Sequence, residues 1–159
     1  MPANDDILIE PAASVDRELL EAMLRLVPQL STSAAVPDAD ALRQMIESDC
    51  TTLLLARDRT QSNRIVGCLA LATFRIPTGL RAWIEDVIVD RETRGKGIGE
   101  ALSREAIRIA QARGARTIEL TSRPSRETAN RLYRRLGFEA RDTNVYRFSG
   151  RLPDPRGDT

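Results

Sequence analysis

The chain of 159 residues carries 24 lysine and arginine residues against 23 aspartate and glutamate residues, and its formal net charge is +1. This length suits one domain with a core of its own. A nearly neutral chain has no overall field to recruit nucleic acid or an anionic membrane. Histidine is absent, which excludes the commonest general base and the commonest metal ligand. Any proton transfer must therefore use carboxylates, tyrosine, water or a terminus.

The N-terminus and the two cysteines favour a cytoplasmic protein without a bound metal. The first ten residues, MPANDDILIE, lack both the basic and the long apolar segment of a secretory signal. No apolar stretch approaches the roughly 18–20 residues of a membrane span. Cys50 and Cys68 lie far apart in the sequence, with no metal-type spacing, which favours two reduced thiols.

Hydrophobic periodicity predicts one α/β domain over residues 1–148, followed by a mobile polar tail at 149–159. The elements follow the order strand, helix, helix, strand, strand, strand, helix, strand, helix, strand, strand. They occupy residues 7–12, 14–27, 38–48, 51–58, 64–74, 81–89, 98–113, 115–122, 125–137, 138–141 and 144–148.

Capping and breaking residues set the predicted helix ends. Ser14 caps the first helix and Pro28 ends it. Either Asp38 or Asp40 caps the second. Gly114 stands where the third helix needs a C-terminal glycine. The three strands after the second helix then form an antiparallel meander, and the last two strands form a hairpin that completes the sheet.

Three glycines alternate in the stretch RGKGIG at residues 94–99, between a strand pattern and a helix pattern. Glycine has the weakest preference for either structure, so its clustering at their junction indicates that the backbone comes close to a ligand. A helix start directs free N–H groups and partial positive charge toward one place. With Arg94 and Lys96 at its rim, the turn is predicted to bind a phosphate group.

A tight connection without a ligand is the alternative, although one glycine would suffice for that. Two common phosphate motifs do not fit. The P-loop pattern fails because Asp90 stands in place of its first glycine and Gly97 in place of Ser or Thr. The dinucleotide pattern fails because Glu100 occupies its third glycine position. Nucleoside triphosphates and NAD are therefore poor candidates.

The stretch at 94–99 resembles the R/Q-x-x-G-x-G/A signature of the GNAT N-acetyltransferases. Two further segments resemble that family in the same order: IEDVIVD at 84–90, with the helix and strand after it, and ANRLYRRLGFE at 129–139. The resemblance implies an acetyl-CoA-dependent acyltransferase that moves an acetyl group to a primary amine by direct transfer. It also implies a three-layer fold with a mixed sheet, in which strands 81–89 and 115–122 splay apart.

In that family the signature binds the pyrophosphate of acetyl-CoA, and the pantetheine arm inserts between the splayed strands. The sequence departs from the family at Arg91, where members often carry Pro, and at Arg126, where many carry Asn. Asn130 lies nearby, so either Arg126 or Asn130 would contact the arm. The cofactor-binding residues implied by the resemblance are Val87, Ile88, Val89, Arg94, Gly95, Lys96, Gly97, Ile98, Gly99, Asn130 and Tyr133.

Thioester aminolysis needs a neutral amine near the carbonyl, stabilisation of the developing oxyanion and a proton for the departing thiolate. A backbone N–H near Val87 could stabilise the oxyanion. Tyr133 stands where the family places its acid; otherwise it is a core aromatic residue. Glu85 is the candidate base and shares a side of the pleat with Val87 if the strand is regular, whereas a bulge would reverse its orientation relative to Asp86. Glu85 could also pair with an arginine or position the amine, which would leave water as the base.

The acceptor site is the least defined part of the sequence. The resemblance places it over residues of the first helices, the strand ends and the last hairpin, namely Leu30, Ser31, Phe74, Arg75, Asn144 and Tyr146. They include no acidic cluster that would attract a polyamine or an aminoglycoside. A small-molecule amine, an amino acid or a peptide amine therefore all fit, and a homodimer is compatible with the fold.

Two other functions fit parts of the sequence. A domain of this kind could bind acyl-CoA as a sensor or interaction module without turnover, although the presence of both Tyr133 and Glu85 favours an enzyme. Nucleic-acid binding through the arginine-rich stretch RLYRR at 131–135 would need a basic face with stacking aromatics or a recognised motif. The sequence shows neither, so no nucleic-acid partner is expected.

Overall fold

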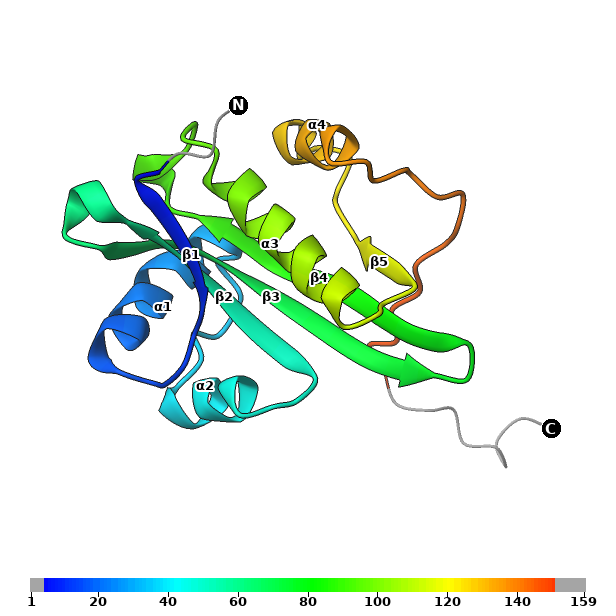
Figure 1. Cartoon of the computed structure of the whole chain (residues 1–159), viewed down its shortest axis with the longest axis horizontal. Helices are drawn as coiled ribbons and strands as arrows, with labels where there is room; N and C mark the ends of the chain where they lie inside the picture. Colours follow the sequence, from blue (N-terminus) through cyan, green and yellow to red (C-terminus); the bar gives the residue numbers. More distant parts are fainter. Residues whose placement is uncertain (1–4, 151–159) are drawn as a thin grey trace.

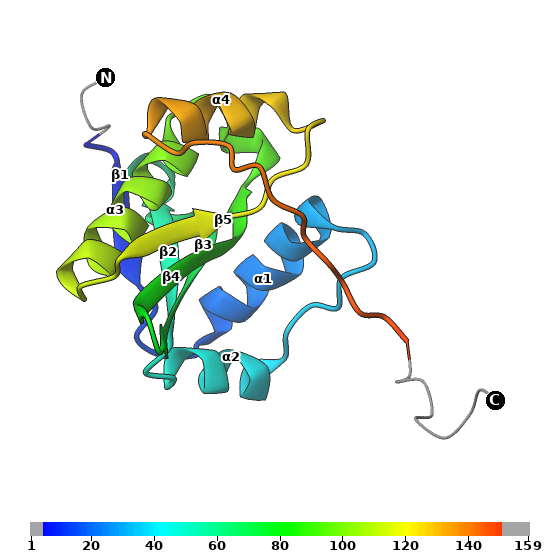
Figure 2. The same cartoon turned by 90° about the vertical axis from the view of Figure 1, so that its right-hand side faces the viewer.

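A mixed sheet separates two layers of helices, as predicted, but in the described residues it has five strands and not the predicted seven (Figure 1, Figure 2). The computed structural model describes residues 5–150; residues 1–4 and 151–159, which hold most of the predicted tail, lie outside it. In the sheet the strands follow their order in the chain, antiparallel except for the parallel last pair. They are β1 Ile7–Pro11, β2 Thr51–Asp58, β3 Arg64–Ile76, β4 Gly79–Val89 and β5 Thr117–Leu120.

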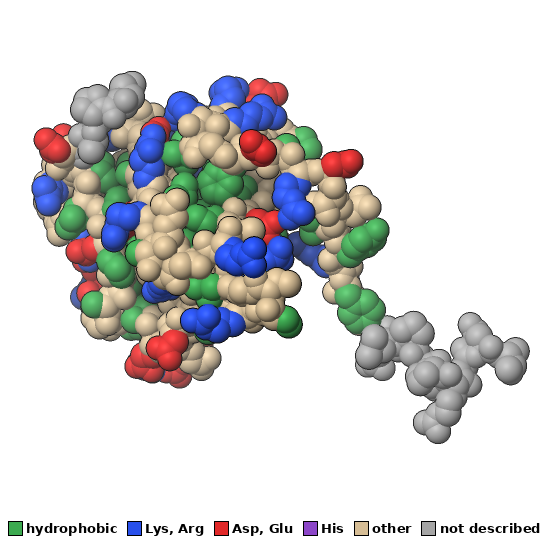
Figure 3. Space-filling model, turned by 45° about the vertical axis from the view of Figure 1, so that its right-hand side comes forward, with side chains coloured by type: hydrophobic (Ala, Val, Ile, Leu, Met, Phe, Trp, Pro, Cys, Tyr) green, Lys and Arg blue, Asp and Glu red, His purple; other side chains and the backbone are tan. Residues whose placement is uncertain are grey.

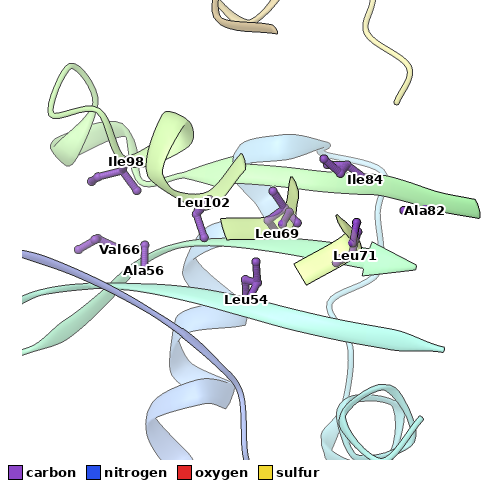
Figure 4. Close-up of a cluster of buried hydrophobic side chains, with 11 residues drawn as sticks. Leu54, Ala56, Val66, Leu69, Leu71, Ala82, Ile84, Ile98 and Leu102 are labelled. Carbon is purple, nitrogen blue, oxygen red and sulfur yellow. The ribbon is translucent and has the colours of Figure 1, made fainter. Parts of the chain in front are cut away.

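Helices α1 and α2 cover one face of the sheet, and α3 and α4 lie on the other (Figure 2). They span Arg17–Leu30, Ala39–Ile46, Ile98–Ala112 and Glu127–Arg135. Alternation along β2 supplies two cores: Leu54 is buried in the α3-side cluster, and Leu53 and Leu55 in the α1-side cluster. Figure 4 shows the α3-side cluster, where Ile98 and Leu102 pack on the sheet. The first turn of α3 is therefore anchored in the core.

Helix α1 continues through Pro28, where the sequence predicted its end. Its cap is Asp16 and not Ser14; the Asp16 carboxylate accepts a backbone N–H at 2.8 Å. Proline removes one N–H from the last turn, but Gln29 adds a bond there, because its Nε2 donates to the Arg25 carbonyl at 3.1 Å. The helix therefore gains a further turn, which brings Gln29 toward the end of β4.

β4 and β5 pair over only four residues, Arg81–Ile84 against Thr117–Leu120. Beyond this pair, β4 continues to Val89 along β3, whereas the chain after β5 leads to α4 (Figure 1). The two strands thus part after Ile84, which confirms the predicted splay. From Glu85 onward, no described strand lies beside β4 on its β5 side.

The predicted hairpin at 138–148 is wrong: no residue after α4 forms a strand in the described chain. Strand-forming side chains favour pairing but need a partner, and β5 offers an edge of only four residues. Val145, Tyr146 and Phe148 are consequently 74, 88 and 67% exposed, and Figure 3 shows hydrophobic side chains standing out just before the grey residues. Arg141 ties this segment to Glu119 of β5.

Candidate functional site

Residues 90–97 form the turn between β4 and α3. A short 3-10 helix, Arg91–Thr93, comes first, and Gly95 and Gly97 follow with φ of 85° and 77°. Such left-handed values cost other residues about 1 kcal/mol or more, which explains glycine at both positions. A Cβ atom at either glycine would meet nothing within 4 Å. We call residues 94–99 the glycine turn; its two left-handed glycines face open space.

The first turn of α3 directs unpaired N–H groups to the same end. Gly97 is the N-cap residue and has no side chain to accept them. Its carbonyl accepts the first helical bond, from the Ala101 N–H at 3.0 Å, so the N–H groups of residues 98–100 have no partner within the helix. Because the positive end of the helix dipole lies there too, the glycine turn fits an anionic phosphate group.

Lys96 holds the glycine turn to the turn between β2 and β3. Its Nζ donates to Oδ2 of Asp58 at 3.1 Å, and Asp58, 1% exposed, also accepts bonds from Thr60 and Gln61. The bonds from Thr60, and then Lys96, outweigh burial and lower the pKa of Asp58 to about 2. The sequence placed this ammonium at the phosphate rim; the structure pairs it with a buried carboxylate.

Asp90 ties the start of the turn to α1. Its buried carboxylate accepts a bond from Arg25 Nε at 2.9 Å and another from Gln29 Nε2 at 3.4 Å. Gln29 also accepts the Arg91 N–H at 2.8 Å, and the Thr93 hydroxyl donates to the Asp90 carbonyl. Burial opposes ionisation, but the bonds to the carboxylate itself, chiefly that from Arg25, keep the pKa of Asp90 below its ordinary value. The turn is thus fixed at both ends by buried carboxylates.

Glu100, in the first turn of α3, would repel a phosphate if its charge were free. Arg135 of α4 donates to its Oε2 at 2.8 Å, and Arg104 donates to its Oε1. The bond from Arg135, followed by that from Arg104, lowers the pKa of Glu100. The two guanidinium groups therefore neutralise the carboxylate and link α4 to the start of α3. Arg94, by contrast, is exposed, and among residues 5–150 its side chain bonds only the Val89 carbonyl, at 3.4 Å.

A bulge interrupts β4 where it leaves β5. Three steps of β4, from Glu85 to Ile88, lie opposite two steps of β3, and Asp86 adopts a left-handed φ of 49°. Ile84 and Val87 both pack in the α3-side cluster, so Glu85, next to Ile84, points to the α1 side. The prediction that Glu85 and Val87 share a side is therefore wrong, because the extra residue shifts the alternation of the strand.

Two exposed carboxylates stand next to each other at this bulge. Glu85 Oε1 accepts the Trp83 Nε1–H at 2.7 Å, two positions back on the same strand. Asp86 lies close enough to Cys68 to help raise its pKa, which burial chiefly brings to about 12. Since Cys68 belongs to the α1-side cluster, the Glu85 carboxylate and the charge of Asp86 both act on the α1 side of the sheet.

Tyr133 lies on α4 and is 8% exposed. Its ring meets Phe138 edge-on, with centroids 5.9 Å apart. Burial raises the pKa of Tyr133, and the charge of Arg126 opposes the shift. Within residues 5–150, its hydroxyl has no protein hydrogen-bond partner. The phenol is therefore a protonated group that is free to donate to a ligand.

Asn130 and Arg126, the two candidates for contact with a donor arm, differ in their bonding. Asn130 Nδ2 donates to the carbonyls of Arg123 and Pro124, at 3.0 and 3.4 Å. Arg126 is exposed, begins α4 as its N-cap residue and acts on Tyr133 through its charge. Asn130 thus shapes the segment between β5 and α4, whereas the Arg126 side chain is available to solvent.

The residues predicted to contact the acceptor occupy three places: Leu30 and Ser31 at the end of α1, Phe74 and Arg75 near the end of β3, and Asn144 and Tyr146 after α4. Phe74 pairs in register with Arg81, four positions or about 13 Å along β4 from Glu85. Tyr146 is 88% exposed and bonds Asn144 at 3.4 Å. Within residues 5–150, no hydrogen bond or ion pair joins one of these three places to another, so their role in acceptor binding stays a prediction.

Sequence reasoning missed the carboxylates and α1 side chains that anchor the glycine turn. Asp58 and Asp90 each follow an apolar strand, which was the one available signal, but their partners lie 38 and 65 residues away along the chain. Across residues 5–150, no three His, Cys, Asp or Glu side chains are grouped as a metal site. Over the same residues, no helix is both long and apolar enough to span a membrane.

Two hollows lie away from the glycine turn. One, of about 290 Å³, is bounded by α3, β5 and Phe138; the other, of about 500 Å³, lies between α3 and the start of β2. Neither includes Glu85, Tyr133 or the glycine turn. The first borders β5, the edge strand that the predicted hairpin would have paired with.

Over residues 18–138 the chain matches the family model described as acetyltransferase (GNAT) family. It is 43% identical over 61 residues to an uncharacterized N-acetyltransferase of Methanocaldococcus jannaschii, a match covering 38% of this chain. It is 35% identical over 71 residues, 45% of the chain, to N-alpha-acetyltransferase 30 of Schizosaccharomyces pombe. The matched part spans only 27 and 47% of those relatives.

A solved structure shows the same fold. It is an aminoglycoside acetyltransferase from an uncultured soil metagenomic sample, in complex with trehalose, with a TM-score of 0.79 and 20% identity. The similarity covers 92% of this chain and 97% of that one. The fold of this chain thus recurs over nearly its whole length in a solved structure.

Proposed function

Because the chain belongs to the GNAT family of acetyltransferases, we propose that it transfers an acetyl group from acetyl-coenzyme A directly to a primary amine. The observation that carries this proposal is the glycine turn, whose left-handed glycines face open space before an uncapped helix start. A diphosphate needs N–H donors and room for its oxygens, and this turn supplies both. The donor is thus held mainly by backbone groups.

The N–H groups of residues 94–99 would hold the pyrophosphate of the donor. Past Ile84, β4 has no strand beside it on the β5 side, so backbone groups near Val87 and Val89 are available to the amides of the pantetheine arm. Acetyl-coenzyme A supplies the activated thioester. The chain's own residues orient that thioester between β4 and the segment that follows β5.

The acceptor amine would approach from the α1 side of the sheet. Glu85 and Asp86 are exposed there, and carboxylates attract an ammonium group. The S. pombe relative is named an N-alpha-acetyltransferase, which favours the α-amino group of a peptide over other amines. Because the matched part is under half of that relative, small-molecule amines are proposed as acceptors as well.

Acid–base chemistry would then follow from three groups. Glu85, through water, takes the proton of the ammonium so that the neutral amine attacks the thioester carbonyl. A backbone N–H at the bulge near Val87 stabilises the developing oxyanion. Tyr133 gives its proton to the sulfur as the C–S bond breaks and regains one from the nitrogen of the new amide. One proton per turnover is released to solvent.

An acceptor screen tests this proposal directly. The full chain is incubated with acetyl-coenzyme A and a panel of amines, and released thiol is measured. The panel includes peptides with free α-amino groups, the same peptides blocked at that group, amino acids and polyamines. Turnover with free peptides only supports α-amino acetylation. Donor binding without turnover across the panel supports an acyl-CoA sensor instead, and absence of donor binding overturns both functions.

A further inference from the structure

We propose that the hydroxyl of Ser122 is a positioning group for the donor, bonding a carbonyl oxygen of its pantetheine arm; this rests on the proposed function. Among the described residues, Ser122 Oγ is the one side-chain oxygen or nitrogen atom that is itself shielded from solvent and lacks a hydrogen-bond partner. Buried polar groups are almost always paired, so an orphan needs an explanation. A serine hydroxyl can donate one bond and accept two, and this one makes none within the protein.

The place of Ser122 in the fold points to the donor. It stands two residues beyond Leu120, the last residue of β5 that pairs with β4. The pairing stops there, and beyond it the chain leads to α4 while β4 continues without a strand on its β5 side. Beyond Leu120, Thr121 and Arg123 are exposed, whereas Ser122 between them is half-buried and its Oγ is buried. The side chain is therefore on the inner side of the segment.

The backbone beside Ser122 is held in place from α4. Asn130 Nδ2 donates to the carbonyls of Arg123 and Pro124, and the Arg126 N–H donates to the Arg123 carbonyl at 3.0 Å. These bonds hold the segment in position, so its movement would not readily give the hydroxyl a protein partner. Rotation about χ1 re-aims the oxygen between staggered positions without moving the backbone. A ligand that enters between the strands can thus be met by this hydroxyl.

The chemistry of the arm fits a hydroxyl donor. Pantetheine carries two amide carbonyls, and an amide oxygen accepts an O–H bond well. Under the proposed function, the glycine turn takes the nucleotide end of the donor. Ser122 therefore acts on the arm and not on the phosphates, and it positions the thioester relative to Tyr133 without touching the reacting atoms.

Ser122→Ala tests this inference with two measurements that do not require turnover. Calorimetry should show that coenzyme A binds about fivefold to tenfold more weakly, the loss expected for one hydrogen bond. Binding of 3′-phosphoadenosine 5′-diphosphate, which lacks the arm, should be unchanged. The Tm of the free protein should rise by about 2 °C or more, because the variant no longer buries an unpaired hydroxyl. Ser125→Ala, an exposed serine in the same segment, should change none of these values.

The outcomes separate this inference from the proposed function. If the wild-type chain binds neither coenzyme A nor the nucleotide, the proposed function fails. If it binds both and Ser122→Ala binds coenzyme A equally well, the inference fails alone. A lower Tm for Ser122→Ala would show that the hydroxyl is already satisfied in the free protein, which overturns the premise. Ser122→Cys, similar in size but a weaker donor, should bind coenzyme A with intermediate affinity.

Discussion

The Lys96 ammonium lies 3.1 Å from Oδ2 of Asp58, a carboxylate that is 1% exposed at the end of β2. This pair joins the glycine turn to a part of the sheet 38 residues earlier in the chain. On the other side, Arg25 and Gln29 of α1 hold Asp90. The N–H groups that would bind a diphosphate are therefore positioned by contacts with the sheet and with α1, and not by the turn alone.

Asp58→Asn should lower the free energy of unfolding at pH 7 by about 2–4 kcal/mol, since it removes the charge that pairs with Lys96 and weakens bonds with Thr60 and Gln61. The pKa of Asp58 is lowered to about 2 in the folded chain. Its ionised form thus stabilises the fold above the ordinary carboxyl pKa, and the contribution is lost as pH falls toward 2. Urea titrations should show the gap from wild type closing between about pH 4 and 2.

Asp40→Asn is the control for that series. Asp40 is an exposed carboxylate paired with Arg43 in a surface helix, so its replacement should change stability by less than about 0.5 kcal/mol at either pH. A pH-independent loss in Asp58→Asn would contradict the assignment of the acid transition to this carboxylate.

Gly97→Trp should weaken coenzyme A binding at least about 100-fold, because the new side chain occupies the open space before α3. Gly114→Trp is a matched control at the other end of the same helix. Both glycines have left-handed φ, 77° and 82°, and a Cβ at either meets nothing within 4 Å. The two variants should therefore lose similar stability, about 1–2 kcal/mol. Equal donor affinities in calorimetry would rule out the glycine turn as the phosphate site.

Tyr133→Phe should reduce kcat by about 100-fold or more while leaving the Kd for coenzyme A within twofold of wild type. The hydroxyl makes no protein hydrogen bond in residues 5–150, so Tm should stay the same and the edge-on contact with Phe138 should persist. Burial raises the pKa of Tyr133, which means that wild-type activity should not fall through loss of this proton below about pH 10. A Tyr133→Phe enzyme with full kcat would assign the ring a packing role only.

Glu85→Gln should lower kcat/KM for the amine about tenfold or more at neutral pH, where the acceptor is an ammonium ion. The amide oxygen can still accept the Trp83 bond, so the fold should be unaffected. At pH values above the pKa of the acceptor amine, deprotonation by the enzyme is no longer needed and the two enzymes should converge. A constant ratio across the pH profile would mean that Glu85 positions the amine without acting as its base.

Asp86→Gly should keep or raise stability, whereas Asp86→Val should lower it by about 2 kcal/mol or more, because valine is strained at a φ of 49°. Thermal unfolding of the two variants, compared with Asp86→Asn, separates the backbone requirement from the carboxylate. If Asp86→Val were as stable as wild type, the left-handed bulge would not exist in solution.

Most of the fold was predictable because helices and strands leave local signals. The apolar run at 51–58 correctly predicted both ends of β2. Gly114, at the end of α3, has the left-handed φ of 82° that a terminal glycine permits. The prediction that Pro28 ends α1 was wrong. The side chain of the next residue, Gln29, donates to the Arg25 carbonyl four residues back and offsets the missing proline N–H. The prediction of the last two strands was wrong because a strand-like composition does not supply a partner strand to pair with.

The glycine turn was predictable from composition, but the geometry around it was not. The orientation of Glu85 depends on a bulge that arises from the register of β4 against β3, and no local pattern encodes register. Lys96 was assigned to the phosphate rim because its partner, Asp58, is distant in sequence and close only in the folded chain. Ser122 carries no motif at all; only the absence of a partner in three dimensions distinguishes it.

Lys96 is also the single lysine of the chain. A protease that cleaves after lysine consequently has one peptide bond to attack, between Lys96 and Gly97, in the middle of the glycine turn. Limited digestion would report on this segment alone, through two fragments that are easily weighed by mass spectrometry. A ligand bound to these amides would slow cleavage, so the fraction of protein that stays intact would report how much of the site is occupied.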